Sequence, residues 1–330
     1  MSKHIPPLHR LFDVQSPQAF EAVCMAVFHY QARHCAIYRE YLSLLGIVPE
    51  TIHRSEDIPF LPIEFFKSHQ VISGNELPQV VFSSSGTTGS LQSRHYVTDL
   101  TVYQRSFRTA FERFYGRPDD MAILALLPAY AEREGSSLIY MVDDLIKRSR
   151  HPLSGYFLYN HGELKQALES TRTSATTTLL IGVTFALLDF VENHPVDFPA
   201  LTVMETGGMK GRRKEMIREE VHERLCTGFN VSAIHSEYGM TELLSQAYSH
   251  GGGLFRCPPW MRIHIRDTND PFTLLPTGRT GAINIIDLAN VHSCAFIATQ
   301  DLGKIHADGR FEVLGRFDQS DIRGCNLLVQ

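Results

Sequence analysis

The feature that most constrains the fold is an alternation of short β-rich segments with helical segments between residues 78 and 225. The β-rich segments are compact apolar runs, and the helical ones repeat their apolar residues every three or four positions. Parallel strands are joined by crossover connections, which are usually helices, so this order predicts a parallel sheet. The expected strands are 79–84, 122–128, 176–183 and 201–208, and the expected helices are 99–114, 136–148, 184–193 and 212–225.

The regions on either side of this alternation follow other patterns. Ser16 and Pro17 predict a helix N-cap with proline at the first helical position, and Gly46 is suited to end that helical region. Near the C-terminus, the segments MRIHIRD, TGAINIID, AFIATQD and GRFEVLG are separated by Gly, Asp or Asn turns, which predicts a small antiparallel sheet. No long linker divides the chain, so we expect one body, 1–330. Its expected parts are a helical region 1–75, an α/β core 76–255 and a β-rich subdomain 256–330.

Composition excludes several classes of partner and location. The 330 residues include 36 acidic and 31 basic ones, a net charge of −5, and no basic block indicates nucleic acid or an anionic membrane as partner. The N-terminus MSKHIPPLHRLF lacks the apolar core of a signal peptide, and the apolar runs are too short to span a bilayer. The six cysteines form no CxxC pair, so we expect free thiols in a cytoplasmic protein.

The stretch FSSSGTTG, residues 82–89, departs most from ordinary composition. It follows the apolar run VVF, so its hydroxyls and unobstructed amides lie at the carboxyl end of an expected strand. Glycine lets the backbone approach a ligand closely, and successive amides bind anions, which favours a phosphate. No lysine follows the glycines, so this is not the GxxxxGK[ST] loop. A surface turn rich in turn-forming residues is the alternative.

Two later stretches carry side chains suited to a nucleotide. In HSEYGMTELLSQ, Tyr238 could stack on a base, Thr241 could bond a phosphate oxygen, and Glu242 offers hard oxygen ligands to Mg²⁺. In ATQDLGKIHADGRFEVLGRFDQSDIRG, Asp301 could accept hydrogen bonds from ribose hydroxyls, and Arg316 could contact the nucleotide.

The order of these three stretches resembles the adenylate-forming enzymes, which include acyl-CoA synthetases, firefly-type luciferases and peptide-synthetase adenylation domains. EREGSSLIYMVDDLI, EYGMTELLSQAY and DIRGCNLL are similar in particular to the LuxE-type acyl-protein synthetases, fatty acid–protein ligases related to phenylacetate-CoA ligases. The resemblance covers roughly residues 15–328. It implies an α/β fold, the large N-terminal domain of the superfamily, with parallel sheets flanked by helices, a small antiparallel subdomain and the small C-terminal lid domain missing.

The resemblance further implies a ligase that activates a fatty or related carboxylic acid with ATP and Mg²⁺, giving an acyl-adenylate and pyrophosphate. In that reaction Thr241 would touch the α-phosphate, Glu242 would bind Mg²⁺, and Asp301 would hold the ribose. Arg316 would lie at the nucleotide. The other residues that the resemblance places at the nucleotide are Ser84, Ser85, Gly86, Thr87, Thr88, Gly89, Gly207, Gly208, Glu237, Tyr238, Gly239 and Met240.

The chain departs from the family pattern in three places. The lysine that often follows the TTG element is absent, and Arg94 or His95 are candidates to replace it. The usual TGD around the ribose-binding aspartate is TQD at Asp301. The sequence ends shortly after GRFDQSDIRG, without the domain that carries a catalytic lysine in many relatives, so Lys210 or Lys304 are candidates for that role.

A cysteine close to the C-terminus suggests a second half-reaction. The LuxE-type enzymes also end on RGC and a short tail, and their cysteine takes the acyl group as a thioester; here it is Cys325. A thiolate attacks a mixed anhydride readily, and Arg323 would lower the thiol pKa. The acyl group would then pass to an acyl reductase or acyltransferase, within a homo-oligomer or a monomer. The alternative is that Cys325 is one of six ordinary free thiols.

Some candidates and alternatives remain beside this interpretation. The end of the strand TLLIG suggests an acyl-pocket wall, formed by Gly182, Val183, Phe185 and Met209. Sevenfold spacing allows a zinc site of His250, Cys257 and His264, although zinc ligands usually lie in closer pairs. The alternative functions are an acyl- or aryl-CoA ligase that uses free CoA, and a non-catalytic scaffold subunit that binds an acyl-adenylate.

Overall fold

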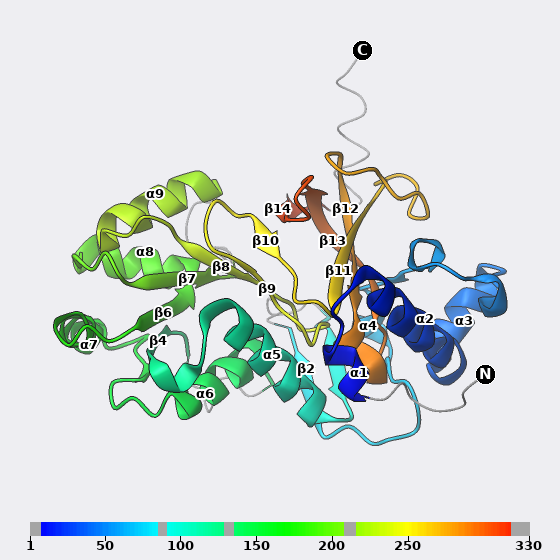
Figure 1. The fold of residues 1–330 in the computed structure, drawn as a ribbon, viewed down its shortest axis with the longest axis horizontal. Coiled ribbons are helices and arrows are strands. Elements are labelled where there is room, and N and C mark those ends of the chain that lie inside the picture. The colour runs from blue at the N-terminus through cyan, green and yellow to red at the C-terminus, as the bar shows by residue number, and fades with distance from the viewer. Residues whose placement is uncertain (1–7, 85–90, 129–134, 208–215, 318–330) are drawn as a thin grey trace, which may run out of the picture. The chain divides into compact units, whose positions relative to one another are not determined.

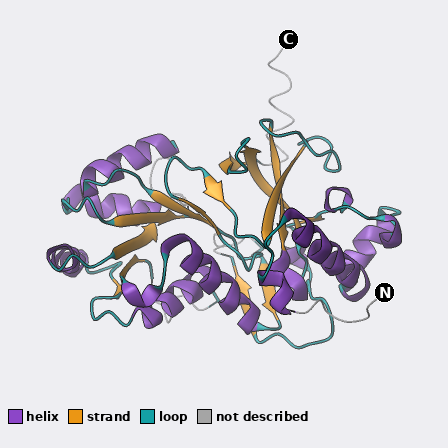
Figure 2. Ribbon diagram, viewed as in Figure 1, coloured by secondary structure: helices purple, strands orange, loops and turns teal. Residues whose placement is uncertain are grey.

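The computed structural model describes residues 8–84, 91–128, 135–207 and 216–317 (Figure 1). The chain forms two compact units, and each contains both helices and strands (Figure 2). Unit 1 comprises Met1–Ser106, Thr241–Ser245 and Arg256–Gln330, and unit 2 comprises Phe107–Met240 and Gln246–Phe255. Helix α5 (Leu100–Tyr115) begins in unit 1 and ends in unit 2.

Unit 2 contains the parallel sheet that the alternation predicts. Its strands lie in the order β5–β4–β6–β7–β8–β9, and every neighbouring pair is parallel except β8 with β9. Every residue of β4 and β6 is buried, because helices cover both faces, with α8 and α9 on one side and α6 on the other (Figure 1). The strands are β4 (Ala122–Leu126), β5 (Gly155–Tyr156), β6 (Thr178–Val183), β7 (Thr202–Thr206), β8 (His235–Tyr238) and β9 (Ala247–Ser249), and β10 (Phe255–Arg256) begins in unit 2 and ends in unit 1.

Most helices of unit 2 match the expected segments. The hydroxyl of Ser136 caps α6 by accepting a hydrogen bond from the amide of Ile139, at 3.4 Å. The expected start of the last helix was wrong, because Ile217 has an extended backbone and α9 begins only at the next residue. The sequence reading also missed α7. The helical segments are α6 (Ser137–Ser149), α7 (His161–Thr173), α8 (Thr184–Asn193), α9 (Arg218–Phe229) and the short η3 (Pro118–Asp120).

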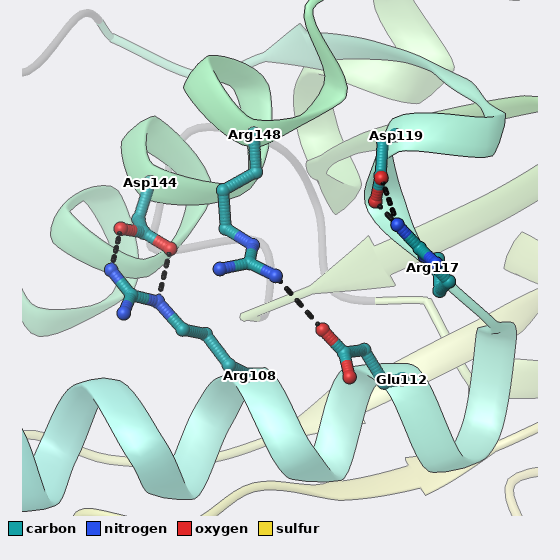
Figure 3. A network of polar contacts seen from close by, with 6 residues as sticks. All are labelled: Arg108, Glu112, Arg117, Asp119, Asp144 and Arg148. Atoms are coloured by element: carbon teal, nitrogen blue, oxygen red, sulfur yellow. Dashed lines mark hydrogen bonds and ion pairs between the residues drawn. The ribbon is translucent and has the colours of Figure 1, made fainter.

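Two ion pairs connect α5 to α6 in unit 2 (Figure 3). One pair is bidentate, with nitrogen–oxygen distances of 2.9 and 2.5 Å, and a second pair has a single contact of 3.0 Å. A third pair lies in the connection that follows α5. In that order, the pairs are Arg108–Asp144, Arg148–Glu112 and Arg117–Asp119.

Unit 1 contains the antiparallel sheet expected after residue 260. Strands β11, β12, β13 and β14 pair antiparallel in chain order, and β1 adds a parallel partner to β13. The buried guanidinium of Arg266 donates to the carbonyls of Ile283 and Thr299, so it ties three of these strands together. The strands are β1 (Leu61–Pro62), β11 (Met261–Arg266), β12 (Thr280–Asp287), β13 (Phe296–Ile305) and β14 (Phe311–Arg316), with η5 (Leu288–His292) after β12.

The N-terminal part of unit 1 is helical, as expected. Ser16 caps α2 by accepting from the amide of Ala19 at 3.1 Å, Pro17 is its first residue, and Gly46 follows the helical region with a φ of +69°. These predictions are confirmed. The helical segments are α1 (Leu8–Phe12), α2 (Pro17–His34), α3 (Ala36–Leu44), η1 (Pro49–Thr51), η2 (Ser55–Asp57) and α4 (Phe65–Ser68). None of the described helices combines the length and the apolarity that crossing a bilayer needs.

The strand before the serine-rich loop is not part of the parallel sheet, which corrects one expectation. β2 (Val80–Ser83) pairs antiparallel with β3 (Arg94–Val97) in a sheet of two strands. The sequence reading missed β3, whose residues RHYV contain only one aliphatic side chain. Because its partner returns within a dozen residues, β2 needs no crossover helix. The serine-rich loop is therefore the connection of a β-hairpin in unit 1.

Candidate functional site

Two serines close the base of the hairpin loop. The amide of Ser84 donates to the carbonyl of Ser93, and the amide of Ser93 donates to the hydroxyl of Ser84, both at 3.0 Å. The two ends of the loop are thus fixed to each other beyond the last pair of the β2–β3 ladder. The remaining loop residues of the predicted phosphate site, Ser85, Gly86, Thr87, Thr88 and Gly89, lie outside the described residues.

The glutamate predicted to bind Mg²⁺ lies beside this base. Glu242 is 6% exposed, and the Ser93 side chain lies close enough to its carboxylate to lower its pKa. Burial raises the pKa of Glu242, and the nearby Ser93 side chain and the charges of Arg316 and Lys67 oppose that rise. One serine therefore contacts both the loop base and the carboxylate, which brings two of the three sequence motifs together in unit 1.

The histidine considered as a replacement for the missing lysine has another role in the structure. His95 is buried on β3, and its Nδ1 donates to the carbonyl of Thr241 at 3.0 Å. Its Nε2 lies 3.0 Å from the hydroxyl of Ser293. Burial lowers the pKa of His95 to about 4, so the imidazole is neutral at pH 7 and supplies no cation for a phosphate. The neighbouring candidate Arg94 is exposed.

The third motif also lies in unit 1. Asp301 on β13 faces Arg316 on β14 as a Cα partner, and the guanidinium Nε lies 3.3 Å from the aspartate Oδ1. The residue Asp301 is 8% exposed, whereas the Arg316 side chain is 70% exposed. Lys304 lies three residues further along β13, opposite Glu312. Asp301 is thus a fixed hydrogen-bond acceptor, which suits the predicted contact with ribose. Arg316 is a cation that faces solvent beside it, which suits the predicted contact with the nucleotide.

Polar side chains also gather where the parallel strands of unit 2 end. The hydroxyl of Thr206, the last residue of β7, donates to Glu237 Oε2 on β8 at 2.6 Å. Burial raises the pKa of Glu237 to about 7, with the charge of Glu205 adding to the rise and Thr206 opposing it. A Cβ at Gly239 would lie 2.4 Å from Glu237 Oε1, so the glycine of YGMTE gives this carboxylate its room.

A second buried carboxylate in unit 2 was not predicted. Glu205 on β7 accepts from the hydroxyl of Thr184 at 2.7 Å, and His222 Nε2 lies 3.8 Å away. Burial opposes its ionisation, but these neighbours outweigh the burial, so the pKa of Glu205 is below its usual value. The Thr184 hydroxyl also lies 2.7 Å from the carbonyl of Gly207, whose φ is +64°. A glutamate in an otherwise apolar strand was the available sequence signal.

The other predicted nucleotide and acyl-pocket residues that the structure describes lie on or next to β6, α8 and β8. Tyr238 is 9% exposed, and its ring centroid lies 5.8 Å from that of Phe255 in a tilted arrangement. Val183 ends β6 next to Thr206 of β7, and a Cβ at Gly182 would meet Leu126 at 2.9 Å, so that glycine serves packing. Phe185 lies in the first turn of α8, and Met240 directly follows Gly239. Gly208, Met209, Lys210, Arg323 and Cys325 lie outside the described residues.

The described residues offer no ready-made site for a metal held by several side chains. Those residues contain no group of three or more His, Cys, Asp or Glu side chains arranged to hold a metal ion, so the zinc alternative at His250, Cys257 and His264 is wrong. Mg²⁺ behaves differently, because it keeps several waters and takes one or two carboxylates together with substrate phosphates. A single buried carboxylate beside an expected phosphate loop, as at Glu242, fits such a requirement.

Comparison with known proteins establishes the fold. No family model and no curated protein matches the chain. The open conformation of a 2-hydroxyisobutyryl-CoA ligase, in complex with 2-HIB-AMP and CoA, matches 92% of this chain and 70% of its own, with a TM-score of 0.65 and 14% identity. The same ligase in the postadenylation state matches 96% of this chain and 72% of its own, with a TM-score of 0.66 and 14% identity. ATP-bound MatB from Rhodopseudomonas palustris matches 72% of this chain, with a TM-score of 0.55 and 17% identity, and this chain spans 47% of MatB.

Proposed function

We propose that the protein activates a carboxylic acid with ATP and Mg²⁺, forming an acyl-adenylate and pyrophosphate. The observation that carries the proposal is the contact of Ser93 with both Ser84, at the base of the serine-rich loop, and the Glu242 carboxylate. Asp301 and Arg316 form the third element in the same unit. Structures of the same fold hold 2-HIB-AMP or ATP, which supports the proposal independently.

The chemistry explains why these groups are needed together. A carboxylate oxygen attacks the α-phosphorus, a new P–O bond forms, and the bond to the β-phosphate oxygen breaks to release pyrophosphate. Two anions must approach each other, so amides and cations have to balance the developing charge. When bound, Mg²⁺ would neutralise phosphate charge, and Glu242 is the residue that would hold it. Arg316 is exposed enough to reach a ligand while it stays paired with Asp301.

A second step would transfer the acyl group to a thiol. We propose Cys325 as the acceptor: its sulfur would attack the acyl carbonyl carbon, forming a thioester and releasing AMP. An acyl reductase or acyltransferase would then take the acyl group from this fatty acid–protein ligase of LuxE type. Free CoA is the alternative acceptor, and the CoA bound in the 2-hydroxyisobutyryl-CoA ligase favours it. A scaffold subunit that only binds an acyl-adenylate is the non-catalytic alternative.

Acid-dependent ATP–pyrophosphate exchange tests the first step. The purified protein is incubated with MgATP, labelled pyrophosphate and a panel of acids that includes short hydroxy acids, aryl acids and long-chain fatty acids. We expect exchange above the acid-free background with at least one class, and the class identifies the substrate. A folded protein that exchanges with none of them contradicts activation and supports the scaffold alternative.

Intact mass spectrometry tests the acceptor. After incubation with MgATP and an active acid, we expect an adduct of acyl mass that hydroxylamine removes. Cys325→Ser should abolish the adduct while exchange continues, and Cys226→Ser is the matched control, since Cys226 is a partly exposed thiol on α9. A wild-type protein that stays unmodified but makes acyl-CoA from free CoA would support the alternative ligase instead.

A further inference from the structure

The five residues Thr241–Ser245, which carry the Glu242 carboxylate, are held by buried polar side chains. This segment belongs to no helix or strand, so no regular ladder satisfies its backbone groups. Among the described contacts, three side chains from elsewhere in unit 1 bond to its backbone instead, and each is 1% exposed or less: His95 on β3, Asp287 at the end of β12, and Asn290 in η5.

Asp287 makes the largest contribution to this arrangement. Its carboxylate accepts from the amides of Leu244 and Ser245, both at 2.9 Å, and from the Ser245 hydroxyl at 2.6 Å. A fourth donor, the amide of Ala289 at 3.1 Å, fixes the carboxylate to η5. A buried carboxylate is stable only when donors surround it, and here three of the four donors are backbone amides, two of them in the segment it holds.

The other two side chains fix the first half of the segment. Asn290 Nδ2 donates to the carbonyl of Glu242 at 2.8 Å and to that of Cys294 at 3.2 Å. His95 Nδ1 donates to the carbonyl of Thr241 at 3.0 Å. Hydrogen bonds therefore hold the carbonyls of Thr241 and Glu242, the two residues with predicted catalytic roles. They also hold the amides of Leu244 and Ser245. The backbone on both sides of this glutamate has fixed partners.

We propose that Asp287 is a positioning residue, which keeps the Thr241–Ser245 backbone in place so that Glu242 presents its carboxylate beside the loop base closed by Ser84 and Ser93. The proposal rests on the proposed function, because it gives Asp287 its role through the metal that Glu242 would hold. Asp287 itself contacts amides and a hydroxyl of the protein, and its effect on the reaction is transmitted through Glu242.

The single tryptophan of the chain reports on this arrangement. Trp260 Nε1 donates to the hydroxyls of Ser245 and Ser106, at 3.0 and 3.1 Å, and Ser245 donates to Asp287. The indole is 1% exposed and has its ring edge-on to Phe12, with centroids 5.0 Å apart. A change at Asp287 should therefore alter Trp260 fluorescence even in a protein that stays folded.

Asp287→Asn is the primary variant, because it keeps the volume and replaces one acceptor oxygen by a donor that faces other donors. The full-length variant should show about tenfold faster hydrogen exchange in the peptide that carries the Leu244 and Ser245 amides, measured by mass spectrometry. The exchange reaction should slow by about 10–100-fold, and the Mg²⁺ concentration for half-maximal rate should rise several-fold, while the KM for the acid changes by less than about twofold. Asp270→Asn is the matched control, an exposed aspartate in unit 1 that bonds only within its own turn among the described contacts.

The outcomes separate the two proposals. A wild-type protein without acid-dependent exchange overturns the proposed function and the positioning role with it. A variant that loses amide protection in this peptide but keeps the rate and the Mg²⁺ dependence overturns the positioning role alone. Loss of protection throughout unit 1 with an unchanged Mg²⁺ dependence shows a merely structural role and also overturns it. If Asp287→Asn does not fold, Ser245→Ala decides by the same readouts, since it removes one donor and leaves both amides.

Discussion

The polar contacts around Thr241–Ser245 in unit 1 and the ion pairs of α5 and α6 in unit 2 use charge in opposite ways. In unit 1 the Asp287 carboxylate is fully buried, and three of its four partners are backbone amides. In unit 2 both partners of each pair are side chains, and those of Arg148 and Glu112 are 38% and 40% exposed (Figure 3).

The difference shows which kind of contact can hold a functional group in place. A backbone amide is already fixed by the chain, so a buried acceptor gains a rigid partner at little further loss of freedom. Two long surface side chains lose rotamer freedom when they pair, and water and salt weaken their attraction. We therefore expect mutations in the first set to affect stability and activity strongly, and mutations in the second to have small and salt-dependent effects.

The largest expected effect belongs to Asp287→Ala, which removes the shared acceptor and leaves three buried amides without it. We expect the free energy of unfolding of unit 1 to fall by at least about 3 kcal/mol. Urea denaturation followed by Trp260 fluorescence measures it, because the only tryptophan lies in unit 1. Asp308→Ala, at an aspartate whose side chain is 47% exposed, should change the value by less than about 0.5 kcal/mol. Equal effects of the two substitutions would contradict the comparison.

Glu242→Gln should have the next largest effect, and on activity instead of stability. Glutamine keeps the volume of the side chain but lacks the charge for a metal, so exchange should fall about 100-fold. The urea midpoint should change little, which separates this residue from Asp287. Glu223→Gln, at an exposed residue of α9, is the control for the same chemical change. A Glu242→Gln protein with more than a tenth of the wild-type rate would exclude this carboxylate as the metal ligand.

The contrast between these two residues also shows what the sequence could reveal. Glu242 could be named as a candidate because hydroxyls, glycine and a carboxylate gather within a few residues of it, and the strand–helix alternation predicted the sheet of unit 2. Asp287 could not be named in this way. The segment IID at the end of an apolar strand does not indicate that the distant amides of Leu244 and Ser245 donate to its carboxylate. Ser93 and Thr206 were missed for the same reason: their partners lie far away in sequence or on a neighbouring strand.

The prediction that the strand before the serine-rich loop belongs to the parallel sheet was wrong for a different reason. The run QVVFSS predicts a strand correctly, but which strand it pairs with depends on RHYV, a segment whose single aliphatic residue is not enough to indicate a strand. His95 lies in that segment, and its neutral, buried state follows from this pairing and from the carbonyl of Thr241. The position of His95 shortly after the serine-rich loop suggested a contact with phosphate, whereas its burial makes the imidazole neutral.

Glu237 shares one property with each of the two sets of contacts. It is a mostly buried carboxylate, as Asp287 is, but its partner is a side chain, the hydroxyl of Thr206. Its pKa is raised from 4.5 to about 7, so between these values the folded state binds the proton more tightly than the unfolded state. Stability should therefore fall as pH rises from about 5 to about 7, by about 1–2 kcal/mol, and Glu237→Gln should remove that slope. Circular dichroism during urea denaturation measures it, because Trp260 lies in the other unit. An unchanged slope in the variant would show that other groups cause it.

The smallest effects are expected at the ion pairs of α5 and α6. A double-mutant cycle on Arg148 and Glu112 should give a coupling energy below about 0.5 kcal/mol that vanishes in 1 M salt. The same cycle on Arg108 and Asp144 should give about 1 kcal/mol, because this pair is bidentate and its side chains are only 32% and 17% exposed. If both couplings were equal and insensitive to salt, exposure and geometry would not explain the strength of these contacts. The distinction between the two units would then have to rest on the backbone partners of Asp287 alone.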